Sequence, residues 1–284
     1  MHTDEILKQI NDLQGMHEFK AFCTRLTTAA ATAETLRLGR VPLPNLIFAA
    51  APGCGVTLHI RLITLLLKEL NLMQFTGEEE YFEWSLANDG EDFDRFLRRV
   101  RQAGGFYGQF HGVVGLDVSS MIDDELPPME RLMEYMQARQ GKILFALIVP
   151  DDTKEHVLQQ LLGRFASVSP AELIRMPFPR DEVLGYVTQR LQRRGFIVTD
   201  EVGAILSNAV LQLSQAKEFE GYQTLQNLTD EIVWHKISRP TDQPTVISAG
   251  DVAFILAKDG YSSHMNASAG KPRRRLGFGA DTEG

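Results

Sequence analysis

Apolar residues along the first 180 positions fall into short continuous runs that alternate with longer, periodic segments. The runs lie at 46–50, 81–86, 112–118, 142–149 and 173–178, and their length is typical of strands in a covered sheet. Between them, apolar residues recur every three or four positions at 58–70, 91–102, 128–139 and 153–165, which predicts helices. Residues 5–37 have the same period, broken at Gly15, and predict two more helices. This alternation indicates an α/β fold with a five-stranded parallel sheet covered on both faces.

After Pro179 the pattern is helical throughout. Helices are expected near 180–194, 200–216, 222–237 and 249–258, and Asp181, Thr199 and Ser248 are suited to cap three of them. The chain is therefore predicted to contain four parts: N-terminal helices at 1–40, an αβα core at 41–179, an all-helical lid domain at 180–260 and a disordered tail at 261–284.

Composition and charge narrow the class of protein. The 284 residues include 29 Lys and Arg and 37 Asp and Glu, a net charge of −8, which disfavours binding of nucleic acid through a clustered positive face. The short basic groups at 98–101 and 273–275 are interpreted mainly as solvated charge. No apolar stretch reaches the roughly 20 residues of a membrane helix. With two cysteines and no basic, apolar leader, we expect a soluble, cytoplasmic protein without a membrane span.

The candidate chemistry lies in the turn after the first predicted strand, Ala50-Ala51-Pro52-Gly53-Cys54-Gly55-Val56-Thr57. Glycines between a strand and a helix allow backbone N–H groups to surround a phosphate, and the helix N-terminus adds partial positive charge. The four defined positions of the pattern G-x-x-x-x-G-K-[ST] correspond to Ala50, Gly55, Val56 and Thr57. The second glycine and the hydroxyl are therefore kept, whereas the first glycine and the lysine are absent. A plain strand-to-helix turn is the alternative interpretation. A helix N-terminus tends to lower the pKa of a thiol such as that of Cys54, but no reactivity is predicted for this residue without knowledge of its exposure.

The chain resembles AAA+ modules, and within them the CbxX/CfxQ type. The resemblance rests on residues 13–20, LQGMHEFK, in the place of that type's "L-x-G-L-x-x-V-K" helix, and on the strand and loop at 46–57. It extends over about residues 10–258. It implies a five-stranded αβα core with a helical lid, and ATP or ADP with Mg²⁺ held between them. It also implies a ring formed with other AAA+ subunits, with a protein client as a further partner.

Carried over by position, the functional residues of that family are mostly altered. The resemblance assigns nucleotide contacts to Pro52, Gly53, Cys54, Gly55, Val56, Thr57 and Gln223. It assigns the metal ion to Thr57 and Asp117, but Val118 replaces the glutamate that activates water. Gln223 stands where the lid carries an arginine, and Arg164 occupies the place of the arginine finger presented to the adjacent subunit. The Walker A, Walker B and sensor-2 positions are thus degenerate, with Asp117 and Arg164 as the remaining catalytic candidates.

These replacements favour a module whose catalysis is impaired. Loss of a charge-assisted hydrogen bond to phosphate costs about 1.5–3 kcal/mol, which leaves nucleotide binding open. Loss of a general base costs about 10²–10⁴ in rate. The chain is therefore predicted to be a pseudo-ATPase, a structural or regulatory subunit of a homo- or hetero-oligomer. Two alternatives stay open. One is an active motor ATPase that takes a cation from elsewhere: of Lys20, Arg61 and Lys68, helix geometry disfavours Arg61 and places Lys68, three turns on, out of reach. The other is a clamp-loader- or helicase-loader-like accessory factor acting on nucleic acid.

Overall fold

The computed structural model describes residues 2–38, 41–86, 90–122, 129–216 and 219–262. The chain folds into two compact units, Met1–Pro179 and Arg180–Gly284, each of which is described by itself. The basic group at 273–275 and all but the first two residues of the predicted tail lie outside the described residues. Within these ranges, no helix has both the length and the apolar character needed to cross a membrane.

The first unit is built on a sheet of five parallel strands, with the order β2-β3-β4-β1-β5. The strands are β1 (Asn45–Ala50), β2 (Tyr81–Ser85), β3 (Gly112–Asp117), β4 (Ile143–Pro150) and β5 (Ala171–Met176). The helices are α1 (Thr3–Asn11), α2 (His17–Thr35), α3 (Val56–Glu69), α4 (Gly90–Ala103), α5 (Glu130–Ala138) and α6 (Glu155–Val168), with short 3₁₀ helices at Gly105–Tyr107 and Ser119–Met121. The predicted α/β fold class is confirmed.

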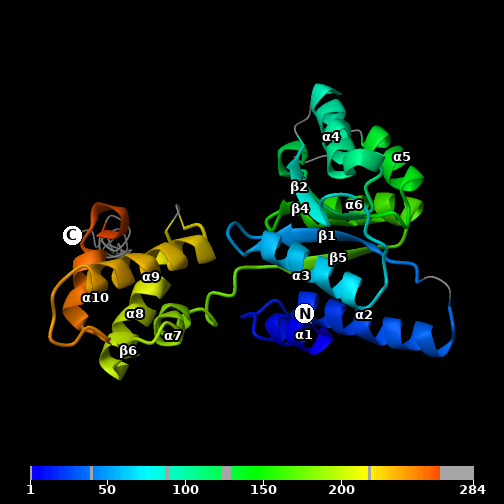
Figure 1. Ribbon diagram of the computed structural model, residues 1–284. Helices are drawn as coiled ribbons and strands as arrows, with labels where there is room; N and C mark the ends of the chain where they lie inside the picture. Colours follow the sequence, from blue (N-terminus) through cyan, green and yellow to red (C-terminus); the bar gives the residue numbers. More distant parts are fainter. Residues whose placement is uncertain (1, 39–40, 87–89, 123–128, 217–218, 263–284) are drawn as a thin grey trace, which may run out of the picture. The chain divides into compact units, whose positions relative to one another are not determined.

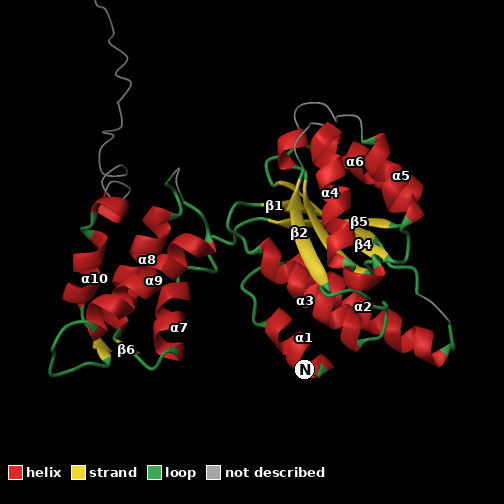
Figure 2. Ribbon diagram, turned by 45° about the horizontal axis from the view of Figure 1, so that its top comes forward, coloured by secondary structure: helices red, strands yellow, loops and turns green. Residues whose placement is uncertain are grey.

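The sheet is the middle layer of three. Helices α1, α2 and α3 cover one face, and α4, α5 and α6 cover the other (Figures 1 and 2). Every residue of β1 is buried, because its successive side chains enter different cores. Ile47 belongs to the core on the side of α4–α6, whereas the ring of Phe48 packs 6.5 Å from that of Phe19 in α2. A strand covered on both faces explains why β1 reads as one continuous apolar run.

In the second unit, the described residues form helices that pack together with a small pair of strands. Its elements are α7 (Tyr186–Arg193), β6 (Ile197–Val198), α8 (Asp200–Leu213), α9 (Tyr222–Ile237), β7 (Val246–Ile247) and α10 (Ala249–Leu256). The predicted caps at Thr199 and Ser248 are confirmed, since their side chains accept the N–H groups of Val202 and Asp251. The strands β6 and β7 pair in parallel, so this unit is not purely helical as predicted. Two-residue strands are too short to produce a periodic signal.

Two boundaries differ from the prediction. The first helix of the unit begins at Tyr186 after Gly185, so Asp181 is not its cap and 180–185 form turns. Val183 in the turns and Val187 in α7 are both buried. Their spacing of four residues is typical of a helix, and for this reason the sequence pattern placed the start of the helix too early. At the other end, Tyr261 is buried and its hydroxyl donates to Glu231 at 3.0 Å, so packed structure continues into the predicted tail.

Candidate functional site

The loop after β1 has the strand-turn-helix shape that the glycines predict. Gly53 and Gly55 have φ angles of 68° and 85°, a left-handed conformation that strains any residue with a Cβ atom. The Ala51 N–H donates to the Met176 carbonyl at 3.1 Å and holds the loop against the end of β5. Cys54 closes a turn with its N–H 3.2 Å from the Ala51 carbonyl. The loop is therefore anchored at the carboxyl edge of the sheet, directly before α3.

Two titratable side chains in and next to the loop are buried: Cys54 of the loop and His59 of α3. The Nδ1 atom of His59 lies 2.7 Å from the Gly55 carbonyl, and its ring meets Phe19 edge-on at 4.5 Å. Burial lowers the pKa of His59 to about 4, so the ring is neutral at pH 7. Burial also raises the pKa of the Cys54 thiol to about 12, which overturns the lowered pKa expected at a helix N-terminus. Neither side chain brings positive charge to the loop, and Cys54 is not a reactive thiolate.

The hydroxyl of Thr57 is already engaged by a carboxylate. It donates to Oε2 of Glu83 at 3.0 Å, and both side chains are exposed to solvent. Glu83 lies in β2, in register with Gly115 of β3. It is absent from the residues predicted for the site, although a glycine inside a strand, as at 115, is a signal that something approaches the backbone closely. Glu83 is therefore a site residue revealed by the pairing of β2 with β3.

Asp117 and Val118 lie at the end of β3, at the same edge of the sheet. Asp117 pairs in register with Ser85, and its Oδ1 accepts the Ser119 N–H at 2.9 Å. Val118 is fully buried, and its N–H donates to the Ile148 carbonyl at 3.1 Å. Glu83 pairs in register with Gly115, two residues before Asp117, so the two carboxylates come from neighbouring strands: Glu83 from the middle of β2 and Asp117 from the end of β3. Among the described residues, no group of three or more His, Cys, Asp or Glu side chains could hold a metal ion.

The cations considered as replacements for the missing lysine are placed elsewhere. Lys20 in α2 donates from Nζ to the carbonyl of Leu13, which lies in the turn between α1 and α2. Lys68 forms an ion pair with Glu80. Arg61 is exposed on α3, one turn after Thr57. The charge lost at Val56 is thus not restored by Lys20 or Lys68.

Arg175, near the end of β5, is the cation in the strand that anchors the loop. Its guanidinium lies 2.9 Å from Oε2 of Glu155, the first residue of α6. This hydrogen bond is one of the causes that lower the pKa of Glu155, after the bond from Gln159. Arg175 is therefore committed to an ion pair at the start of α6.

The two remaining predicted site residues, Arg164 and Gln223, belong to elements that do not adjoin the loop in the chain. Arg164 is partly buried in α6, four residues before that helix ends at Val168. Because α6 runs back from the end of β4 to the start of β5, its last turns lie toward the amino edge of the sheet, away from the loop of the same chain. Gln223 lies in the first turn of α9 in the second unit, and its amide donates to Asn227 at 2.9 Å.

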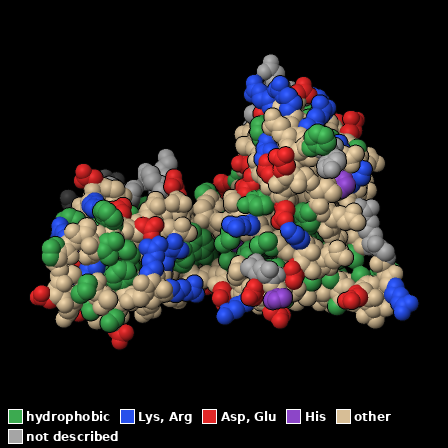
Figure 3. Space-filling view, in the orientation of Figure 1, with side chains coloured by type: hydrophobic (Ala, Val, Ile, Leu, Met, Phe, Trp, Pro, Cys, Tyr) green, Lys and Arg blue, Asp and Glu red, His purple; other side chains and the backbone are tan. Residues whose placement is uncertain are grey.

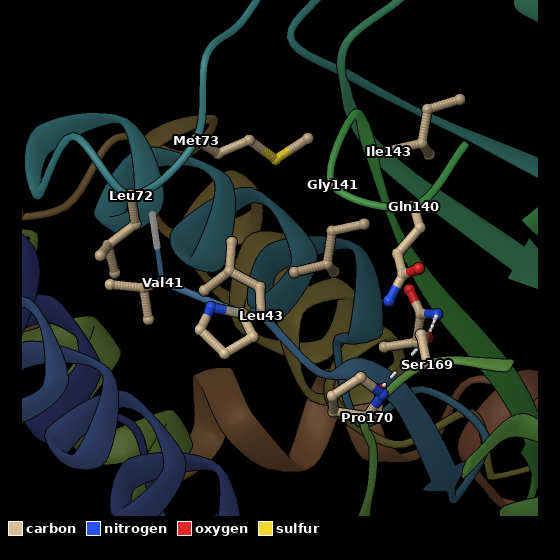
Figure 4. A pocket seen from close by; sticks show the side chains of 12 residues that line it. Val41, Leu43, Leu72, Met73, Gln140, Gly141, Ile143, Ser169 and Pro170 are labelled. Carbon is tan, nitrogen blue, oxygen red and sulfur yellow. Dashed lines mark hydrogen bonds between the residues drawn. The ribbon is translucent and has the colours of Figure 1, made fainter. Parts of the chain in front are cut away.

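A hollow of about 280 Å³ opens at the opposite, amino edge of the sheet (Figure 4). Its lining combines apolar side chains with polar groups of Asn45, Gln140 and Ser169, and the apolar ones include Val41, Leu43, Leu72, Met73, Ile143 and Pro170. The side chain of Asn45 in β1 donates to Ser169, the residue that follows α6, at 2.5 Å and accepts the N–H of Phe145 in β4 at 3.0 Å. These polar groups are satisfied within the protein. The hollow carries no Lys or Arg among its described lining residues, so it does not resemble a phosphate site.

The basic group on α4 is part of a mixed surface. Arg99 forms a two-point ion pair with Glu79, at 2.8 and 2.5 Å, and its guanidinium lies 4.6 Å from the centre of the Phe82 ring. The hydrogen bond from Arg99 lowers the pKa of Glu79. Figure 3 shows Lys and Arg side chains beside Asp and Glu side chains at this end of the first unit. This arrangement agrees with solvated, paired charge.

A nucleotide phosphate fits the loop in shape but not in charge. The two left-handed glycines and the start of α3 form a turn of the kind that surrounds a phosphate. Position 56 is valine, however, and the nearest charged group at Thr57 is the Glu83 carboxylate. The charge of Asp151, just after β4, also acts on Cys54 inside the loop and contributes to its raised pKa. Glu83 and Asp151 therefore place negative charge at the loop.

Comparisons with known proteins concern the architecture alone. No family model and no curated protein matches the chain. Among solved structures, it is similar to a mutant of RuvB from Thermotoga maritima, with a TM-score of 0.49 and 13% identity over 87% of this chain and 70% of that one. A five-stranded parallel sheet with a loop after β1, followed by a helical unit, is the arrangement that the AAA+ resemblance implies. The resemblance to the CbxX/CfxQ type is not tested by the fold or by these comparisons.

Proposed function

We propose that this chain is an AAA+-type pseudo-ATPase, a structural or regulatory subunit that assembles with other subunits or a protein client and does not hydrolyse ATP efficiently. The observation that carries the proposal is the contact between Thr57 and Glu83, in a loop without lysine. The residue that would hold a metal ion beside the phosphates is bound instead to a carboxylate of the same chain.

Catalysis requires groups that this site does not supply. Phosphoryl transfer depends on positioned positive charge at the phosphates and on a residue that orients the attacking water. Val56 supplies no charge, and Val118 is an apolar, buried side chain at the position of the water-activating glutamate. Losing a general base alone lowers a rate by about 10²–10⁴. Together these losses support turnover far below that of an intact motor.

The surviving arginine is consistent with a role in an assembly. Arg164 lies toward the edge of the sheet opposite its own loop, so a catalytic role would have to be at the loop of a neighbouring subunit. Such a residue supplied in trans stabilises transition-state charge at the neighbour's site. In this proposal, Arg164 completes the active site of a competent partner subunit, while the chain's own loop does not support efficient ATP hydrolysis.

The alternative of an active motor has little support from these contacts. Two of its three candidate cations, Lys20 and Lys68, are bound to groups other than the loop. The third function considered is a loader-like factor that acts on nucleic acid. Arg99 on α4 is paired with Glu79, so this ion pair does not favour binding of nucleic acid.

The test is release of inorganic phosphate from Mg-ATP by the purified full chain, alone and then mixed with a competent AAA+ ATPase. We expect the chain alone to release no more phosphate than its Asp117→Ala variant. An Arg164→Ala variant tests the second half of the proposal, since it should lower any stimulation of the partner. Turnover by the chain alone that Asp117→Ala abolishes would establish an active enzyme instead.

A further inference from the structure

We propose that Glu83 is a built-in occupant of the loop, an intramolecular carboxylate that takes the place of the nucleotide's anionic groups and closes the site to phosphate. This inference rests on the proposed function and deepens it, because it names the residue that silences the loop. It goes beyond the loss of catalytic residues: a loop that has only lost its lysine would still bind weakly, whereas a loop with its own anion resists a second one.

The first support is geometric. Side chains of in-register neighbours on adjacent strands point to the same face of a sheet, so Glu83 and Gly115 share a face. A Cβ atom at Gly115 would lie 2.8 Å from Cγ of Glu83 and 2.7 Å from Cδ1 of Ile60 in α3. That space is closed to any larger residue unless these side chains shift. Glycine at 115 therefore makes room for the Glu83 side chain between the sheet and α3, where it meets Thr57.

The second support is electrostatic. Thr57 is the second residue of α3, and the unpaired N–H groups of a first helical turn stabilise negative charge. Gly55, which precedes the helix, has no side chain to cap those groups. A carboxylate on the Thr57 hydroxyl uses the same favourable field that a phosphate would use. An entering phosphate would have to displace Glu83 or lie beside it, and like charges at close range repel.

The third support is the set of charges around the contact. Asp117 ends the neighbouring strand, and Asp151 follows β4 at the same edge of the sheet. No salt bridge joins Glu83 to a Lys or Arg among the residues that the structure describes. The carboxylate thus has no paired cation at the loop, and the aspartates at the same edge of the sheet add negative charge to this region.

The experiment measures binding of Mg-ADP and of a non-hydrolysable Mg-ATP analogue to the full chain by titration calorimetry. Glu83→Gln keeps the size of the side chain and its acceptor oxygen while removing the charge. We expect it to bind at least about 10-fold more tightly than the wild type, and Val56→Lys combined with Glu83→Gln to bind more tightly still. Glu80→Gln is the matched control: it removes one carboxylate three residues away, which pairs with Lys68, and should change affinity less than about twofold.

The outcomes separate this inference from the proposed function. Equal affinity of the wild type and Glu83→Gln, in a variant whose near-ultraviolet circular dichroism is unchanged, would overturn the inference and leave the pseudo-ATPase intact. Tight Mg-nucleotide binding by the wild type that Glu83→Gln abolishes would also overturn it, and would make Glu83 a metal-binding residue. Glu83→Ala serves as the second variant and should give the same gain. Phosphate release by the wild type would instead contradict the proposed function.

Discussion

Helices α3 and α10 both begin beside a carboxylate, and the two carboxylates have different surroundings. At α10, Asp251 belongs to the helix itself: its Oδ2 accepts the N–H and the hydroxyl of Ser248 at 2.9 and 2.7 Å, and Nζ of Lys236 at 3.1 Å. At α3, Glu83 comes from another element, is exposed and contacts Thr57. A carboxylate with its own cation and cap stabilises a helix start. One that lacks a cation at a glycine-rich loop controls what else can approach it.

Burial sets the scale of the first contact. Lys236 is buried in the second unit, and the side chain of Asp251 is largely buried. Burial pushes the pKa of Asp251 upward, but hydrogen bonds from Ser248 and Lys236 outweigh it, and the pKa lies below its ordinary value. The contact at Glu83 is exposed, where ion pairs and hydrogen bonds contribute little to stability. The comparison therefore predicts large stability effects at α10 and small ones at α3.

The largest effect is expected for Lys236→Met. Removing one partner of a buried ion pair typically costs about 3–5 kcal/mol. In this variant Asp251 loses its cation and keeps its hydrogen bonds from Ser248, so the loss is expected near the lower end of that range. Urea unfolding followed by circular dichroism should show this loss for the second unit. The Asp251→Asn variant and the double variant complete a cycle that isolates the pair. A loss below about 1 kcal/mol would mean that Asp251 is held by its cap alone, as Glu83 is held by Thr57.

The next largest effect is a dependence of stability on pH at the start of α3. His59 lies under the α3 start, with a pKa of about 4 against an ordinary value of 6.5. The unfolded chain therefore binds the proton first, and stability falls as the pH drops from 6.5 toward 4. At pH 5 this group alone should lower the unfolding free energy by about 2 kcal/mol relative to pH 7. In the His59→Gln variant the fall between those pH values should be smaller by that amount; equal falls would contradict the depressed pKa.

A moderate effect is expected for Ser248→Ala at α10. Its hydroxyl accepts the Asp251 N–H at 3.2 Å and donates back to the carboxylate, and loss of such a cap typically costs about 1 kcal/mol. The melting temperature of the full chain provides the measurement. Ser248→Thr keeps the cap and should stay close to the wild type, so a similar fall in both variants would point to packing rather than capping.

The smallest effect on stability is expected for Glu83→Gln. Since the carboxylate is exposed, the unfolding free energy should change by less than about 0.5 kcal/mol. Urea unfolding of this variant sharpens the comparison, because its altered nucleotide binding should appear without a change in stability. A loss above about 1.5 kcal/mol would make Glu83 a structural group like Asp251.

Most of the fold follows from local patterns. The five apolar runs correspond to β1–β5, and the glycine break at Gly15 separates α1 from α2. Where the pattern was wrong, its signal was ambiguous or too short. Val183 keeps helical spacing inside a turn, so Asp181 was misplaced as a cap, and the pair β6–β7 has two residues in each strand. Periodicity reports which side chains are buried, and several backbones can bury the same set.

At the loop, too, some features could be predicted from the sequence and others could not. Sequence alone located the glycines of the loop, Thr57 and the loss of lysine at 56, because these are properties of consecutive residues. It did not find Glu83, which is 26 residues from Thr57. Their contact depends on β2 pairing with β3 in one register and on Gly115 leaving space beside Ile60.

Sequence by itself determined the layered α/β architecture and the position of the loop, since burial pattern and turn chemistry are written locally. Only the tertiary structure decided that a carboxylate occupies the Thr57 hydroxyl, that Lys20 and Lys68 are bound elsewhere, and that Cys54 is protonated. The physical reason is that charge, desolvation and hydrogen bonding depend on distances through space, which strand order and register set and neighbouring letters do not.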